Sequence, residues 1–352
     1  MQRRQFLAAS LAAAALPGMA KADGLDPQDA GIRFGTTGSV FGSWTKNDQG
    51  LYALQMSPDI RTIVRDIKHY GLEGFEPYAA QLPQYRDDPL ALKRVGAETG
   101  IAFVSVGDLP ARKGAPVIPA AQLPWLGGPG RAALVDEMEA CARDFLQPLG
   151  IDHWKNNMGL RPPGGPSDDQ LKVLADTANE IGRRTAKYGV RLSLHPHLWG
   201  PMEREPEFRR VMELTDPAYV HLILDTGHNV LGGMDVVKIA DEFFPRITEF
   251  HLKDTFPQFR GNSATPSQDG HYRGPSVYAA VGQGGGVDFP GVFAVMRRRR
   301  FRGWAVFDID APRPGDGSGT VDDNLAASVN YLREKLGVRL PPAKGSDGLY
   351  KG

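Results

Sequence analysis

The feature that most constrains this chain is a repeated unit in which a glycine ends a helix and a short apolar strand follows. Four copies lie in His69–Glu76, Glu98–Ser105, Pro148–Trp154 and Lys187–Leu194, each with the glycine at its third position. Glycine adopts the left-handed conformation that commonly ends a helix at little cost. The residues after each glycine are rich in aliphatic, aromatic and β-branched side chains, which favour strands. The sequence therefore predicts helices that alternate with strands.

The same apolar pattern predicts strands at Ile32–Thr36, Val220–Leu224, Ile247–Leu252 and Trp304–Ile309, which brings the count to eight. Helical patterns fill the intervals, most clearly at Ser57–Tyr70, Ala132–Phe145, Asp168–Tyr188, Met234–Phe244, Phe289–Arg299 and Val321–Lys335. Alternating strands and helices imply parallel strands joined by right-handed crossovers. Eight units favour a closed (β/α)₈ TIM barrel of the α/β class. A dinucleotide-binding fold is less favoured, because no Gly-x-Gly-x-x-Gly motif follows the first strand. We expect a single barrel domain over residues 23–339.

The first 22 residues have the layout of an export signal. Arg3 and Arg4 precede an apolar run at Phe6–Leu16, and Ala20–Ala22 supplies a small-x-small cleavage site. The apolar run is too short to span a bilayer. The paired arginines followed by Phe and Leu resemble a twin-arginine signal, although an ordinary secretory signal is the alternative. We expect a periplasmic or secreted protein with no membrane anchor after cleavage.

Two further segments fall outside the repeat. Residues 255–286 exceed an ordinary connection and predict a lid or substrate loop, in which Gly284–Gly286 could favour an anion. Residues 340–352 have the composition of a loose C-terminal tail.

The charge balance is against a nucleic-acid partner, and the cysteine content excludes intramolecular disulfides. The chain has 41 basic and 41 acidic residues, and removal of residues 1–22 takes away three basic and no acidic residues, which leaves a net charge of −3. This balance is against a nucleic-acid partner, which favours concentrated positive charge. Cys141 is the only cysteine, so no intramolecular disulfide can form and the core must supply the stability.

Residues that bind metals or move protons gather where the predicted strands end, which is where TIM barrels place their active sites. They are Glu76; His153, Lys155 and Asn156; His195 and His197; Asp225 and His228; His251, Lys253 and Asp254; Asp308 and Asp310. Imidazole and carboxylate together suit Mn²⁺, Zn²⁺, Co²⁺ or Fe²⁺. Such an ion polarises the oxygen atoms of a polyol, and a nearby lysine or histidine then acts as acid or base.

Alternation along a strand refines this set, because residues two apart face the same side. It pairs His195 with His197, and Lys253 with His251. Each residue alone also has a structural explanation, such as a turn at Asp225 or a surface ion pair at Lys253. The clustering at several strand ends carries the functional interpretation.

Four stretches resemble the xylose-isomerase-like TIM barrel superfamily, which includes sugar phosphate isomerases, ketose epimerases and inosose dehydratase. They are Leu194–Gly200, Thr215–His228, Phe250–Asp254 and 282–308. Within the superfamily, the residues of these stretches most resemble those of inosose dehydratase and its relatives. The resemblance is diffuse before about residue 185. It implies the TIM barrel and a sugar or polyol substrate.

The resemblance also implies one divalent ion, commonly Mn²⁺, held by Glu, Asp, His and Glu from strands five to eight. Asp225 matches the family aspartate and His251 the family histidine, whereas His195 stands near the first glutamate and Asp308 matches the last. The implied metal ligands are therefore His195, Asp225, His251 and Asp308. The two missing glutamates are the proton shuttles of the ketose epimerases, so their loss favours β-elimination or one-base isomerisation.

These patterns predict an exported, metal-dependent isomerase or lyase acting on a keto-sugar, a keto-glycoside or an inosose-like polyol. The expected proton carriers are Lys253, His197 and His228, and the expected substrate-binding residues are Glu76, His153, Lys155, Trp199 and Asp310. A metal-dependent epimerase with other bases is one alternative, and a catalytically inactive sugar-binding barrel is another. Family members often form dimers, so a homodimer is a further expectation.

Overall fold

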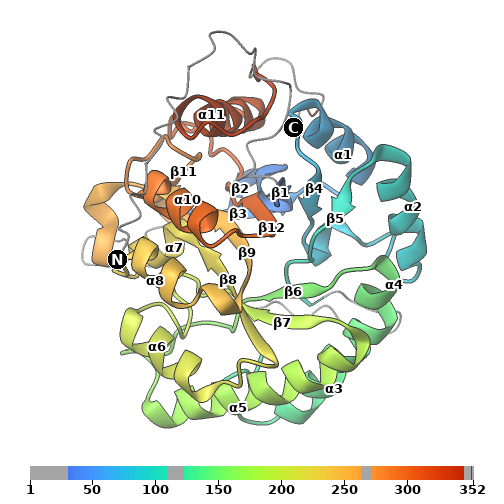
Figure 1. The fold of residues 1–352 in the computed structure, drawn as a ribbon, viewed down its shortest axis with the longest axis vertical. Helices are drawn as coiled ribbons and strands as arrows, with labels where there is room; N and C mark the ends of the chain where they lie inside the picture. The colour runs from blue at the N-terminus through green and yellow to red at the C-terminus, as the bar shows by residue number, and fades with distance from the viewer. Residues whose placement is uncertain (1–30, 110–122, 263–271, 345–349, 351–352) are drawn as a thin grey trace, which may run out of the picture.

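The computed structural model describes residues 31–109, 123–262, 272–344 and 350, and its centre is one parallel eight-stranded sheet. The strands are β1 (Ile32–Thr37), β4 (Gly74–Glu76), β5 (Ala102–Phe103), β6 (His153–Asn156), β7 (Arg191–Leu194), β8 (Val220–Asp225), β9 (Ile247–Leu252) and β12 (Gly303–Phe307). They are hydrogen-bonded in the order β5-β4-β1-β12-β9-β8-β7-β6 and curl into a ring that helices surround (Figure 1). The predicted (β/α)₈ barrel is confirmed.

The outer layer consists of helices placed between the strands. They are α1 (Ile60–His69), α2 (Pro89–Thr99), α3 (Arg131–Cys141), α4 (Gln147–Leu149), α5 (Asp168–Thr185), α6 (Glu205–Leu214), α7 (Thr226–Leu231), α8 (Val236–Glu242), α10 (Phe289–Arg298) and α11 (Val321–Lys335). Local sequence sets their limits. Helix α5 begins at a capping box of Ser167 and Gln170, and it buries Leu171, Leu174 and Ile181 at helical spacing.

The glycines of the repeated unit end their helices as the sequence predicts. Gly71, Gly100, Gly150 and Gly189 have φ values of 74°, 75°, 85° and 72°. A residue with a Cβ is strained in this left-handed region, which is why glycine recurs at this point of each unit.

Side chains close the ring between its two edge strands, β5 and β6. The backbone N–H of Lys155 donates to Oγ of Ser105 at 2.9 Å, and the indole N–H of Trp154 donates to the carbonyl of Val106 at 3.1 Å. Strand β5 is only two residues long, so little backbone is available there for a ladder.

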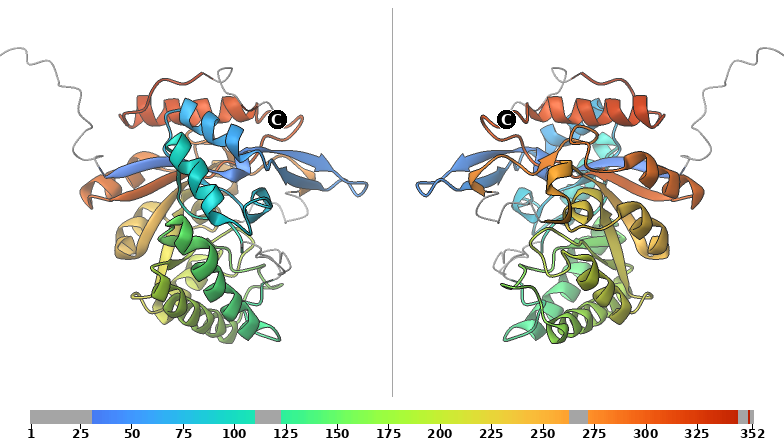
Figure 2. Two further views of the ribbon diagram at one scale, coloured as in Figure 1. Left: turned by 90° about the vertical axis from the view of Figure 1, so that its right-hand side faces the viewer. Right: turned by 90° about the vertical axis from the view of Figure 1, so that its left-hand side faces the viewer.

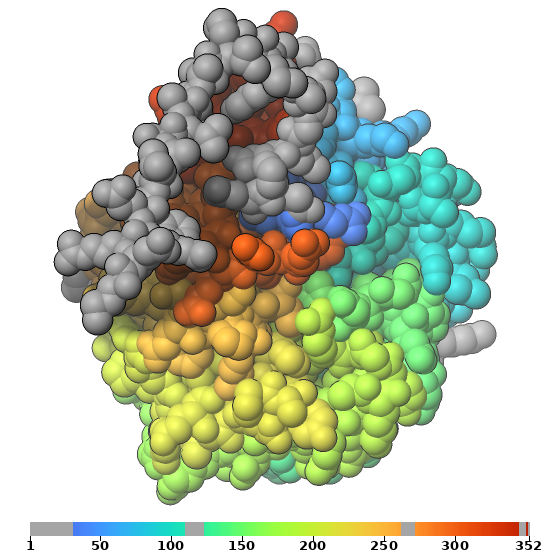
Figure 3. All heavy atoms as spheres, in the orientation of Figure 1, coloured from blue at the N-terminus to red at the C-terminus, as the bar shows by residue number. Residues whose placement is uncertain are grey.

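The interior of the barrel is packed. Glu76, Lys155 and Glu249 are fully buried there, and Figure 3 shows atoms filling the middle of the ring on the face where the strands begin. Among the described residues, no helix combines the length and hydropathy needed to cross a bilayer.

A hairpin that the repeat did not predict follows β1. Strands β2 (Gly42–Lys46) and β3 (Tyr52–Met56) pair antiparallel and project away from the ring of helices, on the side where the barrel strands end (Figure 2). The helical patterns of the sequence also did not predict helices α2, α6 and α7. Helix α7 has only six residues, and Pro89 and Pro206 open α2 and α6 at positions where proline is tolerated in a helix.

The sequence predicts an export signal at the N-terminus and a loose tail at the C-terminus. The expected signal at residues 1–22 lies outside the described residues. The structure describes two parts of the C-terminal tail, residues 340–344 and 350, and each makes a contact with the barrel. The backbone of Ala343 exchanges two hydrogen bonds with the side chain of Asn330, and the ring of Tyr350 lies 5.3 Å from that of Phe41.

Candidate metal and active site

A cluster of buried imidazole and carboxylate groups lies at the carboxyl ends of β7, β8, β9 and β12. His195, Asp225, His228 and Asp308 each offer one ligand atom, and these atoms lie within 4.8 Å of one another. His251 adjoins them, with Nδ1 3.2 Å from Oδ2 of Asp308 and 3.9 Å from Oδ2 of Asp225. The structure therefore brings together all four residues that the sequence predicts as ligands.

Local structure aims the Asp225 carboxylate at this cluster. Asp225 ends β8 and caps α7, where Oδ1 accepts the backbone N–H of His228 at 2.7 Å. The other oxygen, Oδ2, is buried and has no hydrogen-bond partner within the described parts of the chain. Burial, together with the charge of Asp308, raises the pKa of Asp225 to about 7. An unpaired buried carboxylate is costly, and a bound cation is a common remedy.

The hydrogen bonds of two histidines distinguish their roles. Nδ1 of His195 faces Oδ1 of Asn157 at 2.8 Å, so it carries the proton and Nε2 keeps a lone pair. Nδ1 of His228 accepts the backbone N–H of Leu198 at 3.2 Å, so Nε2 of His228 carries the proton. His195 is therefore suited to bind a metal, whereas His228 is suited to donate a hydrogen bond.

Both imidazoles are neutral. Burial and the charge of His251 hold the pKa of His195 well below its ordinary value, and burial with the nearby His197 does the same to the pKa of His228. The rings of His197 and His228 lie 3.7 Å apart. Burial lowers the pKa of His197 to about 4, and its Nδ1 donates to the carbonyl of Leu198 at 2.6 Å. Nε2 of His197 is left with a lone pair, as a general base requires.

A second charged layer lies beneath the cluster, inside the barrel. Nε2 of His251 is 3.3 Å from Oε1 of Glu249 and 3.4 Å from Oε2 of Glu76, and these three residues form a second group able to hold a metal. Burial opposes charge on His251, yet Glu76, Asp308 and Glu249 together hold its pKa well above the ordinary value. His251 is therefore protonated between carboxylates above and below it.

The family of xylose isomerase-like TIM barrels matches residues 64–335. The chain belongs to this family. Among its relatives, an inosose dehydratase of Salmonella agona is 29% identical over 151 residues, which cover 41% of this chain and 48% of that protein. The chain thus matches about half the length of such curated relatives.

Two solved structures share the fold at low identity. A sugar phosphate isomerase/epimerase from Parabacteroides distasonis superposes with a TM-score of 0.62 at 17% identity, covering 91% of this chain and 100% of that one. The IOLI protein with a bound zinc atom gives a TM-score of 0.61 at 15% identity, covering 86% of this chain and 97% of that one.

Within this xylose isomerase-like barrel, the five residues predicted to contact substrate differ in position. Lys155 is buried, with Nζ 2.7 Å from Oε1 of Glu76. His153 begins β6 and lies in the lower layer, with its ring nitrogens 2.6 Å from Asp152 and 2.8 Å from Glu249. A direct contact between His153 and substrate is therefore not supported by the geometry, because both nitrogens are engaged inside the barrel.

The other two predicted contact residues lie higher, beyond the strand ends. Oδ1 of Asp310 accepts a hydrogen bond from Nζ of Lys253 at 3.0 Å. Trp199 is half-buried, adopts φ of 64°, and donates its backbone N–H to Glu203 at 2.5 Å. Its indole ring lies 6.4 Å from the ring of Tyr272. The structure brings Asp310 to the cluster and places Trp199 at its periphery.

The two buried lysines of this site are cations. Nζ of Lys253 donates to the carbonyl of Asp308 at 2.8 Å and lies 4.4 Å from the ring centre of Tyr278. Burial opposes its charge, but Asp308 and Asp310 raise the pKa of Lys253 above the ordinary value. Lys155 has a matching arrangement over Tyr78, at 4.5 Å, and its pKa is also raised by Glu76 despite burial. Lys253 can therefore donate a proton or stabilise negative charge, but it is not available as a base at neutral pH.

Sequence reasoning missed Glu249, Tyr78 and Tyr278. Alternation could have found Glu249, which lies two residues before His251 on the same strand. Tyr78 likewise follows Glu76 by two residues. No strand periodicity marks Tyr278, whose hydroxyl lies 3.4 Å from Nδ1 of His228.

The segment predicted as a lid or substrate loop delivers Tyr278 to the site. Its described part includes the short strands β10 (Asp254–Thr255) and β11 (Tyr278–Ala279), which pair antiparallel. The Gly284–Gly286 loop, predicted to favour an anion, binds a carboxylate of the same chain. Oδ2 of Asp254 accepts the N–H groups of Gly284 and Gly285 at 2.8 and 3.1 Å. A Cβ at Gly284 would collide with the carbonyl oxygen of Thr255, so glycine is required at this approach.

Proposed function

We propose that this protein is a divalent-metal-dependent isomerase or lyase that acts on a sugar or polyol, namely a keto-sugar, a keto-glycoside or an inosose-like ring. The observation that carries the proposal is the buried cluster of His195, Asp225 and Asp308 at the strand ends, where Nδ1 of His251 lies 3.2 Å from Oδ2 of Asp308. Similarity to inosose dehydratases supports the substrate class, and the zinc atom bound by the IOLI protein supports a divalent metal.

The residues present fit a divalent ion. Nε2 of His195 and Oδ2 of Asp225 lie 3.6 Å apart, and both lack a hydrogen-bond partner among the described residues. Two imidazoles with two carboxylates form a donor set that Mn²⁺, Zn²⁺, Co²⁺ and Fe²⁺ accept, and Mn²⁺ is our first candidate. A bound ion would polarise the carbonyl or hydroxyl oxygen atoms of the substrate and ease removal of a proton from the adjacent carbon.

The remaining groups divide into a base and proton donors. His197, neutral with a lone pair on Nε2, accepts the proton from the carbon next to the carbonyl. Lys253 supplies a positive charge near the substrate oxygen atoms and can protonate a leaving oxygen, so that a C–O bond breaks as a C=C bond forms. His228, whose Nδ1 accepts the N–H of Leu198, carries a proton on Nε2 that it can donate to a substrate oxygen. One neutral base, one cationic donor and one neutral donor suit β-elimination or one-base isomerisation better than epimerisation by two bases.

Elemental analysis and product analysis together test the proposal. We expect about one Mn, Zn, Co or Fe per purified chain, and turnover of keto-sugars or inososes that a chelator removes and that metal restores. Proton NMR in D₂O distinguishes the chemistry, because elimination gives an unsaturated product whereas epimerisation gives a stereoisomer with one deuterium. A protein that neither contains nor takes up metal, and converts none of these compounds, would instead be an inactive sugar-binding barrel.

We also propose that the protein is exported through the twin-arginine route. The support is the order of Arg3, Arg4, the apolar run Phe6–Leu16 and the small residues Ala20–Ala22. Replacement of both arginines by lysine should retain the precursor in the cytoplasm, as seen by fractionation and immunoblotting. Unchanged periplasmic recovery of that variant would indicate another export route.

A further inference from the structure

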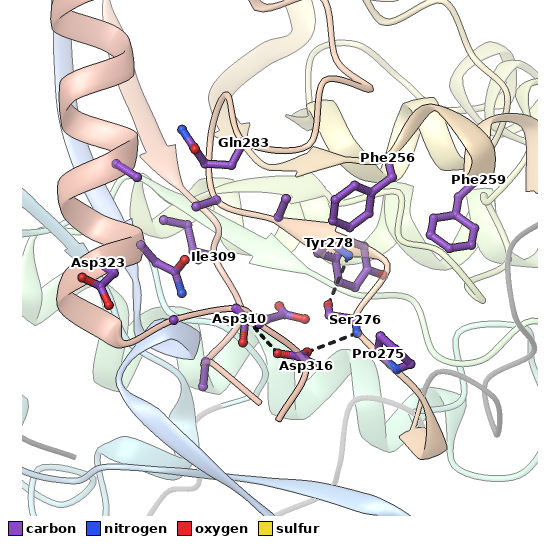
Figure 4. Close-up of a pocket in the computed structure, with 18 of the residues that line it drawn as sticks. Phe256, Phe259, Pro275, Ser276, Tyr278, Gln283, Ile309, Asp310, Asp316 and Asp323 are labelled. Carbon is purple, nitrogen blue, oxygen red and sulfur yellow. Dashed lines mark hydrogen bonds between the residues drawn. The ribbon is translucent and has the colours of Figure 1, made fainter. Parts of the chain in front are cut away.

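A large cavity adjoins the metal cluster on the side of β12. It has a volume of about 810 Å³ and lies between the segment around β10 and β11, the connection after β12, and the start of α11 (Figure 4). Much of its wall is apolar, formed by Phe256, Phe259, Pro275, Tyr278, Ile309 and Ala327. The two phenylalanine rings stand 6.3 Å apart, edge to face. Such a wall suits a flat apolar group.

Two residues belong to both the cavity and the candidate active site. Tyr278 lines the cavity, while its ring lies 4.4 Å from Nζ of Lys253 and its hydroxyl 3.4 Å from Nδ1 of His228. Asp310 also lines the cavity and accepts a hydrogen bond from Lys253 at 3.0 Å. A molecule that reacts beside Lys253 therefore extends into the cavity if it carries a substituent on that side.

The charge of the cavity wall selects against anions. Its described lining contains the carboxylates of Asp310, Asp316 and Asp323, and neither lysine nor arginine. The start of α11 offers no anion site either, because the Asp323 carboxylate accepts the N–H and hydroxyl of Thr320 there at 3.0 and 2.8 Å. A phosphate group placed here would face like charge without a compensating cation.

We infer that the substrate is a glycoside whose uncharged, aromatic aglycone occupies this cavity while its oxidised sugar ring lies at the metal cluster. The inference rests on the proposed function and narrows its substrate class. It separates this chain from enzymes of small free sugars, inososes or sugar phosphates, because none of these would fill an apolar cavity beside the reacting groups.

Matched pairs of ligands test the inference on the metal-loaded enzyme. Binding of phenyl glucoside and methyl glucoside, in both anomeric forms, is measured by calorimetry, and turnover is measured with the corresponding 3-keto-glucosides. Burial of a phenyl ring should favour the phenyl compound over the methyl compound by roughly 10- to 100-fold in affinity and in kcat/KM. The 6-phosphate of the methyl 3-keto-glucoside should be a poorer substrate than the unphosphorylated compound.

Two substitutions perturb the cavity in opposite senses. Ala327→Trp fills it from α11, and Phe256→Ala removes part of its wall, so each should reduce the phenyl-to-methyl ratio by about tenfold or more. Lys335→Trp, which adds the same side chain to the exposed end of α11, is the matched control and should keep the wild-type ratio.

The outcomes separate this inference from the proposed function. Equal use of phenyl and methyl compounds, or a preference for the phosphate, overturns the inference and leaves the proposed function standing. A phenyl preference in binding without turnover of any keto-sugar supports the cavity assignment and contradicts the proposed function. If neither glucoside binds and neither 3-keto-glucoside is turned over, the inference is wrong, and turnover of free keto-sugars and inososes then decides the proposed function.

Discussion

Replacing Asp225 with asparagine should stabilise the metal-free protein while abolishing its response to metal. In the metal-free protein Oδ2 of Asp225 is buried without a partner among the described residues, and burial with the charge of Asp308 raises the pKa of Asp225 to about 7. Asparagine removes this charge, yet its Oδ1 can still accept the N–H of His228 that begins α7. The substitution therefore separates the charge from the helix cap.

The size and pH range of the effect follow from the pKa shift. A carboxyl group with a raised pKa holds a proton in the folded state that the unfolded chain has already lost, so the stability of the wild type falls as the pH rises from about 4 to about 7. The shift of about three pKa units corresponds to at most about 4 kcal/mol above pH 7. At about 2 °C per kcal/mol for a chain of this size, Asp225→Asn should melt up to about 8 °C above the metal-free wild type at pH 8, and at the same temperature near pH 4.

Thermal unfolding after dialysis against EDTA, from pH 4.5 to 8.5, measures this difference. Added Mn²⁺ or Zn²⁺ at about 100 times its Kd should stabilise the wild type by about 2.7 kcal/mol and the variant not at all. Asp225→Ala is the control, since it removes the cap as well and should be about 1 kcal/mol less stable than Asp225→Asn. The reasoning fails if metal-free Asp225→Asn is no more stable than the wild type at pH 8, or if metal stabilises both equally.

Three further perturbations test other parts of the site. Lys253→Met should retain bound metal by elemental analysis but lose at least 100-fold in kcat, because it removes the cation beside the substrate; unchanged turnover would exclude Lys253 from the chemistry. Burial opposes charge on His153, but hydrogen bonds to Asp152 and Glu249 raise its pKa to about 9. The free energy of unfolding of the wild type should therefore decline by up to about 3 kcal/mol as the pH rises from 6.5 to 9. Denaturant titrations of His153→Gln should show no such decline. Asp254→Ala leaves the N–H groups of the Gly284–Gly286 loop without their buried acceptor and should cost about 2 to 4 kcal/mol in urea unfolding, whereas a loss below 0.5 kcal/mol would mean that water replaces the carboxylate.

The barrel could be predicted from the sequence because its signals are local and recur. Each helix-ending glycine and the apolar run after it are read within about eight residues, and the strand Ile247–Leu252 was predicted with the limits that β9 has in the structure. The same rule located Asp225 and His251, because side chains at the ends of parallel strands meet at one end of a barrel. Structural features that depend on repeated or neighbouring residues could therefore be predicted.

Features that depend on contacts between segments distant in the sequence could not be predicted. Tyr278 reaches His228 from an irregular segment 50 residues later in the chain, and no periodicity marks it. The protonation of Lys253 also could not be inferred, since it depends on Asp308 and Asp310, 55 and 57 residues away. Sequence order gives the identity of such neighbours only after the fold is known.

Charge balance explains how the buried site can exist both with and without an ion. In the metal-free protein Asp225 holds its proton up to about pH 7, and His251 keeps its proton well above the ordinary range because carboxylates lie on both sides of it. A divalent ion at Oδ2 of Asp225 and Nδ1 of His251 would displace both protons, so two positive charges would replace two and the net charge of the buried region would stay constant. Metal binding should therefore strengthen as the pH rises from 5 to 8, and the thermal titrations of the wild type would show metal stabilisation that grows over this range. Stabilisation independent of pH would mean that the ion binds groups that carry no proton beforehand, and His251 would then not be a ligand.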